Sequence, residues 1–295
     1  MKLVMTLLVR DEYDVVKANI LFHLERGVDA VVVIDNGSID GTREILEELS
    51  KSADIRIIDE PGRNYDQTTW VTRAALIARD EMRANWVLNN DADEFWVSRD
   101  GTLKDVLCRA GSNNVLLCKR LNMVTGYDAC EDRLWYEWLT HRVKTPVARP
   151  KINDIYTDPL PCPYFYLDLP PKALARTEGL VNVAQGNHNA SFDTGASAIT
   201  APIDIFHFPI RSSAHFEKKI TQGGSAYENY DLFQKDIGWH WRRWYRLYQE
   251  QGLEAALKDA LPSTETLTAD VQNGVAIEDK RFVSLAKQIV NGKSK

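Results

Sequence analysis

The stretch AVVVIDNGSIDGTREIL, from Ala30 to Leu46, contains a strand signal, a turn and a helix signal in direct succession. Its β-branched run AVVVI favours a strand that is covered on both faces. The segment DNGSIDGT (35–42) combines turn-forming residues with Ser, Asp and Thr side chains that can cap a helix. TREILEELS (42–50) is amphipathic at helical spacing. A strand followed by a turn and a helix is the repeating unit of an α/β fold.

The same unit occurs on both sides of this stretch. KLVMTLLV (2–9) predicts a first strand, and the helix that follows it ends near Gly27. IRII (55–58) predicts a third strand, a helix over 68–85 follows, and WVLN (86–89) predicts a fourth strand. This alternation predicts an α/β fold with a doubly wound, mainly parallel sheet and helices on both faces.

The second half of the chain is less regular and predicts a mixed α+β portion. The expected elements are helices over 102–111, 213–222 and 239–257, extended segments over 114–124 and 203–210, and a Pro- and aromatic-rich stretch over 146–171. We therefore expect one domain over 1–225 and a helical extension over 226–295. Within the domain we distinguish a first half, 1–100, from a second half, 101–225.

Composition restricts the class of protein. The chain has 295 residues, 44% of them hydrophobic and 26% charged, which is typical of a globular protein. Its net charge of -6 argues against a nucleic-acid partner held by bulk electrostatics. No apolar run approaches the ~20 residues of a membrane helix, and charged residues follow the short apolar N-terminus at once. We expect a cytoplasmic protein whose four cysteines, Cys108, Cys118, Cys130 and Cys162, are free thiols.

The segments at the carboxyl ends of the four predicted strands are polar, whereas the strand interiors are apolar. These segments are RDE (10–12), DNGSIDGT (35–42), DEPGRNYDQ (59–67) and NDADEF (90–95). Ligands of open α/β sheets bind beyond this edge, so we expect the functional site there. The first strand–helix turn lacks GxGxxG and the chain has no GxxxxGK[ST], which argues against a dinucleotide cradle and a P-loop.

The segment NDADEF places Asp91, Asp93 and Glu94 within four residues, directly before Phe95 and Trp96. Three carboxylates close together repel one another, and burying them beside large apolar groups costs free energy. Either the turn is therefore solvated or a positive group lies against it. Side chains alternate along an extended chain, which points the carboxylates of Asp91 and Asp93 the same way. Two such carboxylates suit Mn²⁺ or Mg²⁺ bound together with substrate phosphates. The alternative is an acidic turn that only caps the following helix.

VVVIDNGSIDGTREIL together with WVLNNDADEFW (86–96) resembles the family 2 glycosyltransferases of the GT-A fold. It is closest to the small bacterial group with the patterns D-x-G-S-x-D-G-T and D-A-D-E-F. The resemblance implies an inverting transfer of a sugar from a nucleotide-diphosphate sugar, with a divalent metal held by the two aspartates. It also implies that Asp35 contacts the nucleoside, and that Val9, Arg10 and Glu12 form the nucleotide-facing end of the first strand. Asn36 departs from the family's usual DDGS.

The resemblance also implies that 1–100 is a nucleotide-binding half and 101–225 an acceptor-shaping, metal-completing half, so further site residues are expected in the second half. HFPIRSSAHFEKK (207–219) resembles a family segment, which implies that His207 completes the metal shell; His188 is a second candidate. Arg211 and Lys218 are placed to neutralise a departing diphosphate. The general base for the acceptor hydroxyl is expected among Glu131, Asp132 and Glu94, with Asp193 as a further alternative.

Two other functions remain possible on the sequence. The first is a sugar-nucleotide nucleotidyltransferase, although LVRDEYD (8–14) lacks the Gly-rich loop that this class usually carries. The second is a non-catalytic domain of the same fold that binds a sugar or a partner. The acceptor is expected to be a glycan or a lipid-linked molecule. If the acceptor is lipid-linked, Arg242, Arg243 and Arg246 are candidates for peripheral contact with the inner membrane face.

Overall fold

The computed structural model describes residues 1–62, 66–129, 134–228 and 238–290. The chain divides into two compact units. The first comprises 1–121, 170–207 and 286–295, and the second comprises 122–169 and 208–285. The predicted boundary at residue 225 falls inside the second unit, and the predicted extension over 226–295 stays a prediction.

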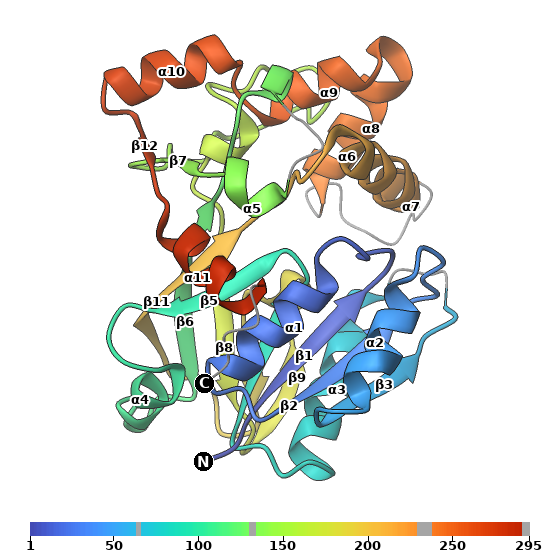
Figure 1. Ribbon diagram of the computed structural model, residues 1–295, viewed down its shortest axis with the longest axis vertical. Helices are drawn as coiled ribbons and strands as arrows, with labels where there is room; N and C mark the ends of the chain where they lie inside the picture. The colour runs from blue at the N-terminus through green and yellow to red at the C-terminus, as the bar shows by residue number, and fades with distance from the viewer. Residues whose placement is uncertain (63–65, 130–133, 229–237, 291–295) are drawn as a thin grey trace. The chain divides into compact units, whose positions relative to one another are not determined.

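The first unit is built on an eight-stranded sheet with the strand order β3-β2-β1-β4-β8-β6-β11-β5 (Figure 1). The first four strands of this order run parallel, and β8 pairs antiparallel with both β4 and β6. The strands are β1 (Leu3–Val9), β2 (Ala30–Asp35), β3 (Ile55–Asp59), β4 (Trp86–Asp91), β5 (Glu94–Ser98), β6 (Val115–Asn122), β8 (Lys172–Arg176) and β11 (Ala198–His207). A separate hairpin consists of β9 (Leu180–Val183) and β10 (Ala190–Phe192).

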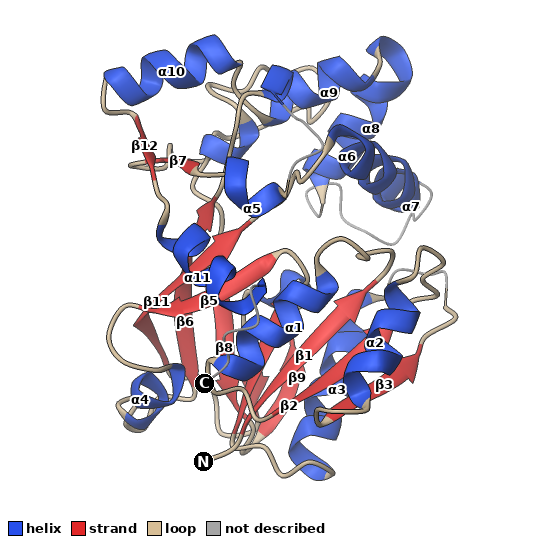
Figure 2. Cartoon of the chain, in the orientation of Figure 1, coloured by secondary structure: helices blue, strands red, loops and turns tan. Residues whose placement is uncertain are grey.

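Helices cover both faces of this sheet (Figure 2). They are α1 (Val16–Glu25), α2 (Thr42–Ser50), α3 (Gln67–Asp80) and α4 (Leu103–Cys108). The small residues Ala74, Ala75 and Ala78 of α3 pack against Val4 and Val32 in a buried core. Because β1 and β2 are buried on both faces, their sequences are almost continuously apolar rather than alternating.

The sheet curls because two strands far apart in its order are adjacent in the chain. Only Ala92 and Asp93 separate the end of β4 from the start of β5. β5 nevertheless pairs with β11 at the last position of the order, with Glu94 opposite His207. The connection between β4 and β5 therefore brings the ends of several strands to one place.

The second unit is mainly helical and has an aromatic core. Its elements are α5 (Trp135–Trp138), α6 (Ser213–Lys219), α7 (Ser225–Glu228), α8 (Trp239–Gln251), α9 (Leu253–Ala260) and α10 (Thr264–Gln272), with β7 (His141–Val143) paired to β12 (Ala276–Glu278); α11 (Arg281–Val290) spans the boundary of the units. Trp244 packs edge-on against Tyr164 and Phe216. Arg243 is buried and forms an ion pair with Asp259 at 2.8 Å, so its guanidinium is used inside the unit.

The predicted α/β fold, with its mainly parallel sheet and mixed C-terminal portion, is confirmed. Two local predictions were wrong. The helix expected over 239–257 is interrupted at Gly252, whose φ of 88° lies outside the helical region. The helix expected over 68–85 spans only Gln67–Asp80, and Asp66 caps it by accepting a hydrogen bond from the Thr69 amide. Cys108, Cys118 and Cys162 are free, as expected, and Cys130 lies outside the described residues.

Within the described parts of the chain, every helix is too short or too polar to span a lipid bilayer.

Candidate active site at the carboxyl edge of the sheet

The carboxyl ends of the parallel strands lie level with one another. In the sheet register Val9 is opposite Asp35, Asp35 is opposite Asp59, and Leu8 is opposite Asp91. The strand ends that the sequence marked as polar therefore form one edge. Asp35 and the acidic turn, which we define as residues 91–94, both belong to it.

Most of the D-x-G-S-x-D-G-T motif shapes this edge. The backbone amide of Asp11 donates to Ser38 Oγ at 3.0 Å, and the Ile39 amide donates back to Asp11 Oδ1 at 2.8 Å. Asp40 accepts from the amide of Tyr13 at 3.2 Å. These reciprocal bonds hold the loop after β1 to the loop after β2, and they explain why a short motif is rich in Ser and Asp.

Gly41 has a steric reason to be glycine. Its φ of 100° is unfavourable for other residues, and a Cβ at this position would lie 2.9 Å from the ring of Tyr13. The next residue, Thr42, starts α2 and accepts a hydrogen bond from the Glu12 amide at 2.9 Å. Glu12 is thus a buried part of the same loop contact.

The turn geometry orients the carboxylate of Asp35. Oδ1 accepts from the Ser38 amide at 3.0 Å, and Oδ2 lies 3.7 Å from Arg43 Nη1. Arg43 is also paired with the exposed Asp59. Asp35 is only 4% exposed, so its carboxylate is held in one direction at the end of β2.

Asn36, the departure from the DDGS pattern, uses its amide group as a donor. Its Nδ2 donates to the carbonyl oxygens of Glu60 and Gly62, both at 2.8 Å, and its Oδ1 accepts from Arg10 Nη1 at 3.4 Å. An aspartate could not donate the first two bonds. The departure therefore connects the end of β2 to the loop after β3.

Asn19 in α1 fixes the backbone of the acidic turn. Its Nδ2 donates to the carbonyl oxygens of Ala92 at 2.9 Å and Glu94 at 2.8 Å. Its Oδ1 accepts from Asn90 Nδ2 at 3.0 Å, and Asn90 Oδ1 in turn accepts from Trp96 Nε1 at 2.8 Å. A connected, buried set of amide groups of this kind specifies one conformation of the turn.

The positive group that the acidic turn requires is Lys172, at the start of β8. Its side chain is 1% exposed, and Nζ contacts Asp91 Oδ2 and lies 3.3 Å from Glu94 Oε1. Burial opposes the charge of Lys172, but the two carboxylates outweigh it and raise its pKa. Arg120 Nη1 lies 3.5 Å from the same Glu94 oxygen. The solvated alternative therefore does not apply to Glu94, which is fully buried.

Burial governs the chemistry of Glu94. It raises the pKa of this carboxyl from 4.5 to about 7, although Lys172 acts in the opposite direction. Its Oε2 is buried and has no hydrogen-bond partner among the described residues. A fully buried carboxyl held by two cations favours an internal role over direct contact with an acceptor hydroxyl. Its assignment as general base remains a prediction.

Asp93 and His207 form a pair of donors that fits a divalent cation. His207 ends β11, and its Nε2 lies 3.8 Å from Asp93 Oδ1. Both residues are buried to about nine-tenths. Carboxylate oxygen and imidazole nitrogen are ligands that Mn²⁺ accepts, and two such atoms at this separation can share one ion. His188, the rival candidate, hydrogen-bonds through Nδ1 to the Pro171 carbonyl at 2.8 Å.

The remaining predicted residues lie elsewhere. Glu131 and Asp132 are outside the described residues. Arg211 and Lys218 belong to the second unit, where the Arg211 guanidinium is buried and lies 2.7 Å from His215 Nε2. Their predicted contact with a diphosphate stays a prediction.

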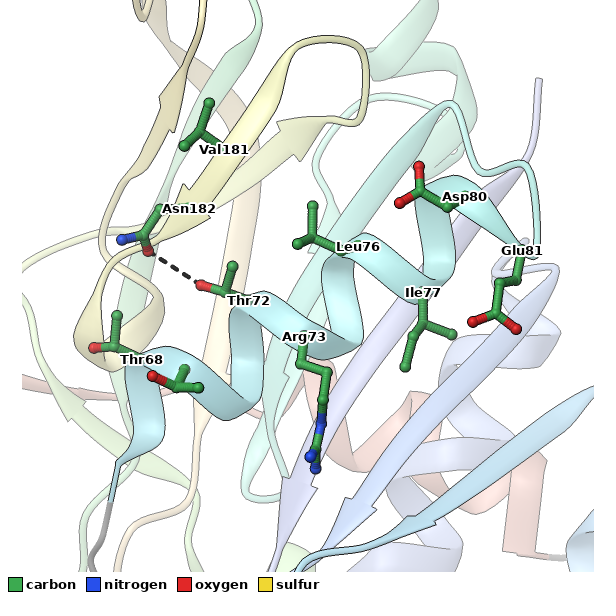
Figure 3. Close-up of a pocket in the computed structure, with 10 residues that line it drawn as sticks. Thr68, Thr72, Arg73, Leu76, Ile77, Asp80, Glu81, Val181 and Asn182 are labelled. Carbon is green, nitrogen blue, oxygen red and sulfur yellow. Dashed lines mark hydrogen bonds between the residues drawn. The ribbon is translucent and has the colours of Figure 1, made fainter.

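An open groove of about 520 Å³ runs along α3 and β9 (Figure 3). Thr72 Oγ1 donates across it to Asn182 Oδ1 at 3.1 Å. Its other lining residues include Leu76, Ile77 and Asp80, which belong to successive turns of one helix. Its lining comes from α3, Glu81 and β9 and includes neither Asp35 nor a residue of the acidic turn, so we do not regard it as the site.

Comparison with known proteins gives one family match. Residues 10–127 match the model of the family described as Glycosyl transferase family 2. This region contains Asp35, Asn36 and the whole acidic turn, but it ends before Lys172 and His207. A search of curated proteins gave no significant match.

Solved structures show distant similarity. S. aureus TarS 1–349 has 16% sequence identity, covers 85% of this chain and 73% of its own, and gives a TM-score of 0.43. The complex of TarS 1–349 with UDP-GlcNAc has 15% identity, the same coverage and a TM-score of 0.41. Mycobacterium tuberculosis glucosyl-3-phosphoglycerate synthase, in complex with Mn²⁺, uridine-diphosphate and glucosyl-3-phosphoglycerate, has 14% identity, covers 41% of this chain and 44% of its own, and gives a TM-score of 0.27. At these values an activity is not transferable from those proteins to this chain.

Proposed function

We propose that this protein is a metal-dependent glycosyltransferase that transfers a sugar from a nucleotide-diphosphate sugar to an acceptor hydroxyl with inversion. One observation carries the proposal. The level carboxyl edge of the sheet holds Asp35 and the acidic turn in fixed orientations, inside the region that matches the glycosyltransferase family. Such an edge is where α/β sheets bind nucleotides.

The proposal assigns a role to several residues of this edge. Asp35 accepts hydrogen bonds from the nucleoside, while Val9, Arg10 and Glu12 shape the nucleotide-facing end of β1. Asp93 and His207 hold Mn²⁺ or Mg²⁺, which when bound stabilises the charge of the departing diphosphate. Their burial keeps water from competing for these donors.

The remaining roles rest on the resemblance stated above. Arg211 and Lys218 add positive charge for the diphosphate, and Glu131 or Asp132 takes the proton from the acceptor hydroxyl. Inversion follows from a single displacement, in which one carboxylate acts as base and no covalent sugar–protein bond forms. The acceptor is a glycan or a lipid-linked molecule, and the compartment is the cytoplasm, at the inner membrane face where the acceptor is lipid-linked.

The first test measures thermal stabilisation by a panel of nucleotide sugars, with and without Mn²⁺, because a ligand that binds the folded state raises the melting temperature. We expect a diphosphate sugar to stabilise the wild type only when Mn²⁺ is present. Asp93→Asn and His207→Gln should each remove the Mn²⁺-dependent part. The matched control Asp100→Asn changes an exposed aspartate of the same unit and should retain it.

Two results would contradict the proposal. The first is Mn²⁺-dependent stabilisation that survives in Asp93→Asn. The second is formation of a nucleotide sugar from a sugar phosphate and a nucleoside triphosphate, which would identify a nucleotidyltransferase instead.

A further inference from the structure

The proposed function does not explain Lys172, a buried group of the candidate site. It is the first residue of β8, KALAR, whose three central residues are apolar, and its side chain is 1% exposed. A lysine in such a position is rare unless it is paired, because moving an ammonium ion out of water is costly. Its partners are two residues of the acidic turn, Asp91 and Glu94.

Both oxygens of the Asp91 carboxylate are engaged within the protein. Oδ2 is paired with Lys172, and Oδ1 accepts from Asn187 Nδ2 at 3.1 Å. Asn187 is 1% exposed and has a φ of 59°, so a buried turn holds this donor in place. Asp91 is thus already supplied with the cation and the donor that a carboxylate ligand would otherwise seek from a metal ion.

The charges around the acidic turn nearly cancel. Counted in their ionised forms, Asp91, Asp93 and Glu94 contribute three negative charges, and Lys172 and Arg120 contribute two positive charges, which leaves a formal charge of -1. A dication gains less from a site of charge -1 than from one of charge -3, because each nearby positive charge repels it. The phosphates of a bound nucleotide would supply the missing negative charge.

We propose that Lys172 is a positioning residue that occupies the place of a cation at Asp91, so that the metal is held by Asp93 and His207 and binds together with the donor diphosphate. This inference rests on the proposed function and deepens it. It predicts that the nucleotide-free protein binds Mn²⁺ weakly and that UDP tightens the binding.

The test measures Mn²⁺ affinity from the electron paramagnetic resonance signal of free Mn²⁺, in the absence of nucleotide. Lys172→Met should bind Mn²⁺ at least about tenfold more tightly than the wild type, because it removes a nearby positive charge and releases Asp91. Lys104→Met, at a half-buried lysine paired with Asp29 in the same unit, is the control and should bind Mn²⁺ as the wild type does.

A double-variant cycle assigns the gain to Asp91. In the wild-type background Asp91→Asn should change the nucleotide-free Mn²⁺ affinity less than about threefold, whereas Asp93→Asn should abolish it. In the Lys172→Met background Asp91→Asn should reverse the gain. If Lys172→Met does not fold, the double variant Lys172→Met with Glu94→Gln removes one charge of each sign and should still gain affinity through Asp91.

Weaker or unchanged Mn²⁺ binding in both Lys172 variants would overturn the inference, because a lysine that only supports the fold would give that result. Equal losses in Asp91→Asn and Asp93→Asn would overturn it as well. If UDP tightens Mn²⁺ binding by the wild type in either of these cases, the proposed function stands while this inference fails. A wild type that binds no Mn²⁺ with or without UDP would overturn both.

Discussion

His23 should make the stability of the first unit depend on pH. Its ring is fully buried, Nε2 accepts a hydrogen bond from the Trp96 amide at 3.2 Å, and Nδ1 pairs with the Asn19 carbonyl at 2.8 Å. Nε2 must therefore be the unprotonated nitrogen, and Nδ1 must carry the hydrogen. A second proton would break the bond to Trp96 and place a charge out of water, near Arg26. Burial accordingly lowers the pKa of His23 from 6.5 to about 4.

The sign and size of the effect follow from these two pKa values. Below pH 6.5 the unfolded chain binds a proton at His23, whereas the folded protein does so only near pH 4. The contribution of His23 to the free energy of unfolding is therefore fully present above pH 6.5, and it falls as the pH decreases toward 4. At about 1.4 kcal/mol per pKa unit, the loss is about 3 kcal/mol over this range.

Glu94 acts in the opposite direction over nearly the same range. Its folded pKa of about 7 lies above the unfolded value of 4.5, so it adds stability that is present at low pH and lost as the pH rises through 7. The wild-type curve alone therefore cannot isolate His23. The assay is urea unfolding of the wild type, His23→Gln and Glu94→Gln at pH 7 and pH 4.5.

Glutamine can accept from the Trp96 amide and donate to the Asn19 carbonyl without titrating. We expect the stability of the wild type relative to His23→Gln to fall by about 2.5 kcal/mol between pH 7 and pH 4.5. The stability of the wild type relative to Glu94→Gln should instead rise as the pH falls from 7 to 4.5. Parallel curves for the wild type and His23→Gln would refute the reasoning, because His23 would then bind protons equally in both states.

Two further predictions concern carboxylates in separate units. Burial works against the charge of Asp279, but hydrogen bonds from Arg142 at 2.8 Å and Arg281 at 2.7 Å outweigh it and lower its pKa from 3.8 to about 2. Asp279→Asn should therefore lower the free energy of unfolding at pH 7 by about 2 kcal/mol, measured by urea unfolding. This difference from the wild type should vanish as the pH falls from about 4 to 2. Equal stability of the two proteins at pH 7 would contradict this prediction. Asp35→Ala should weaken the binding of the free nucleoside diphosphate (UDP or GDP, according to the donor) and of the full donor equally. We expect a loss of roughly 1–3 kcal/mol in binding free energy by calorimetry. A loss of affinity for the sugar nucleotide alone would reassign Asp35 to the sugar.

The fold could be predicted because its signals are local. The continuous apolar runs that became β1 and β2 reflect burial on both faces, and each is followed by turn residues that have a stated geometric use. The misplaced helix boundaries have equally local causes. Gly252 and Asp66 change the backbone at single positions, and hydrophobic periodicity does not detect such changes.

The partners of the acidic turn could not be predicted in the same way. Lys172 is 81 residues from Asp91 in sequence, and β8 reaches it by pairing antiparallel with β4, a connection that no periodic pattern specifies. The three acids beside apolar residues indicated that a positive group lies nearby, but they did not indicate which residue supplies it. Lys172, the first residue of KALAR, is a candidate for this group, because a charged residue at the start of a buried strand needs a partner of opposite charge.

The curl of the sheet links this charge pairing to the proposed chemistry. Because β4 and β5 are joined by two residues, Asp91 remains on one strand pair and Glu94 on another. Lys172 contacts both, so it connects the two parts of the curled sheet across the turn. Asp93, between them, points instead to His207 at the end of β11. The short β4–β5 connection thus places Asp91 and Glu94 against Lys172 and places Asp93 toward His207, which is why Asp91 and Asp93 should respond differently to substitution although they are two residues apart.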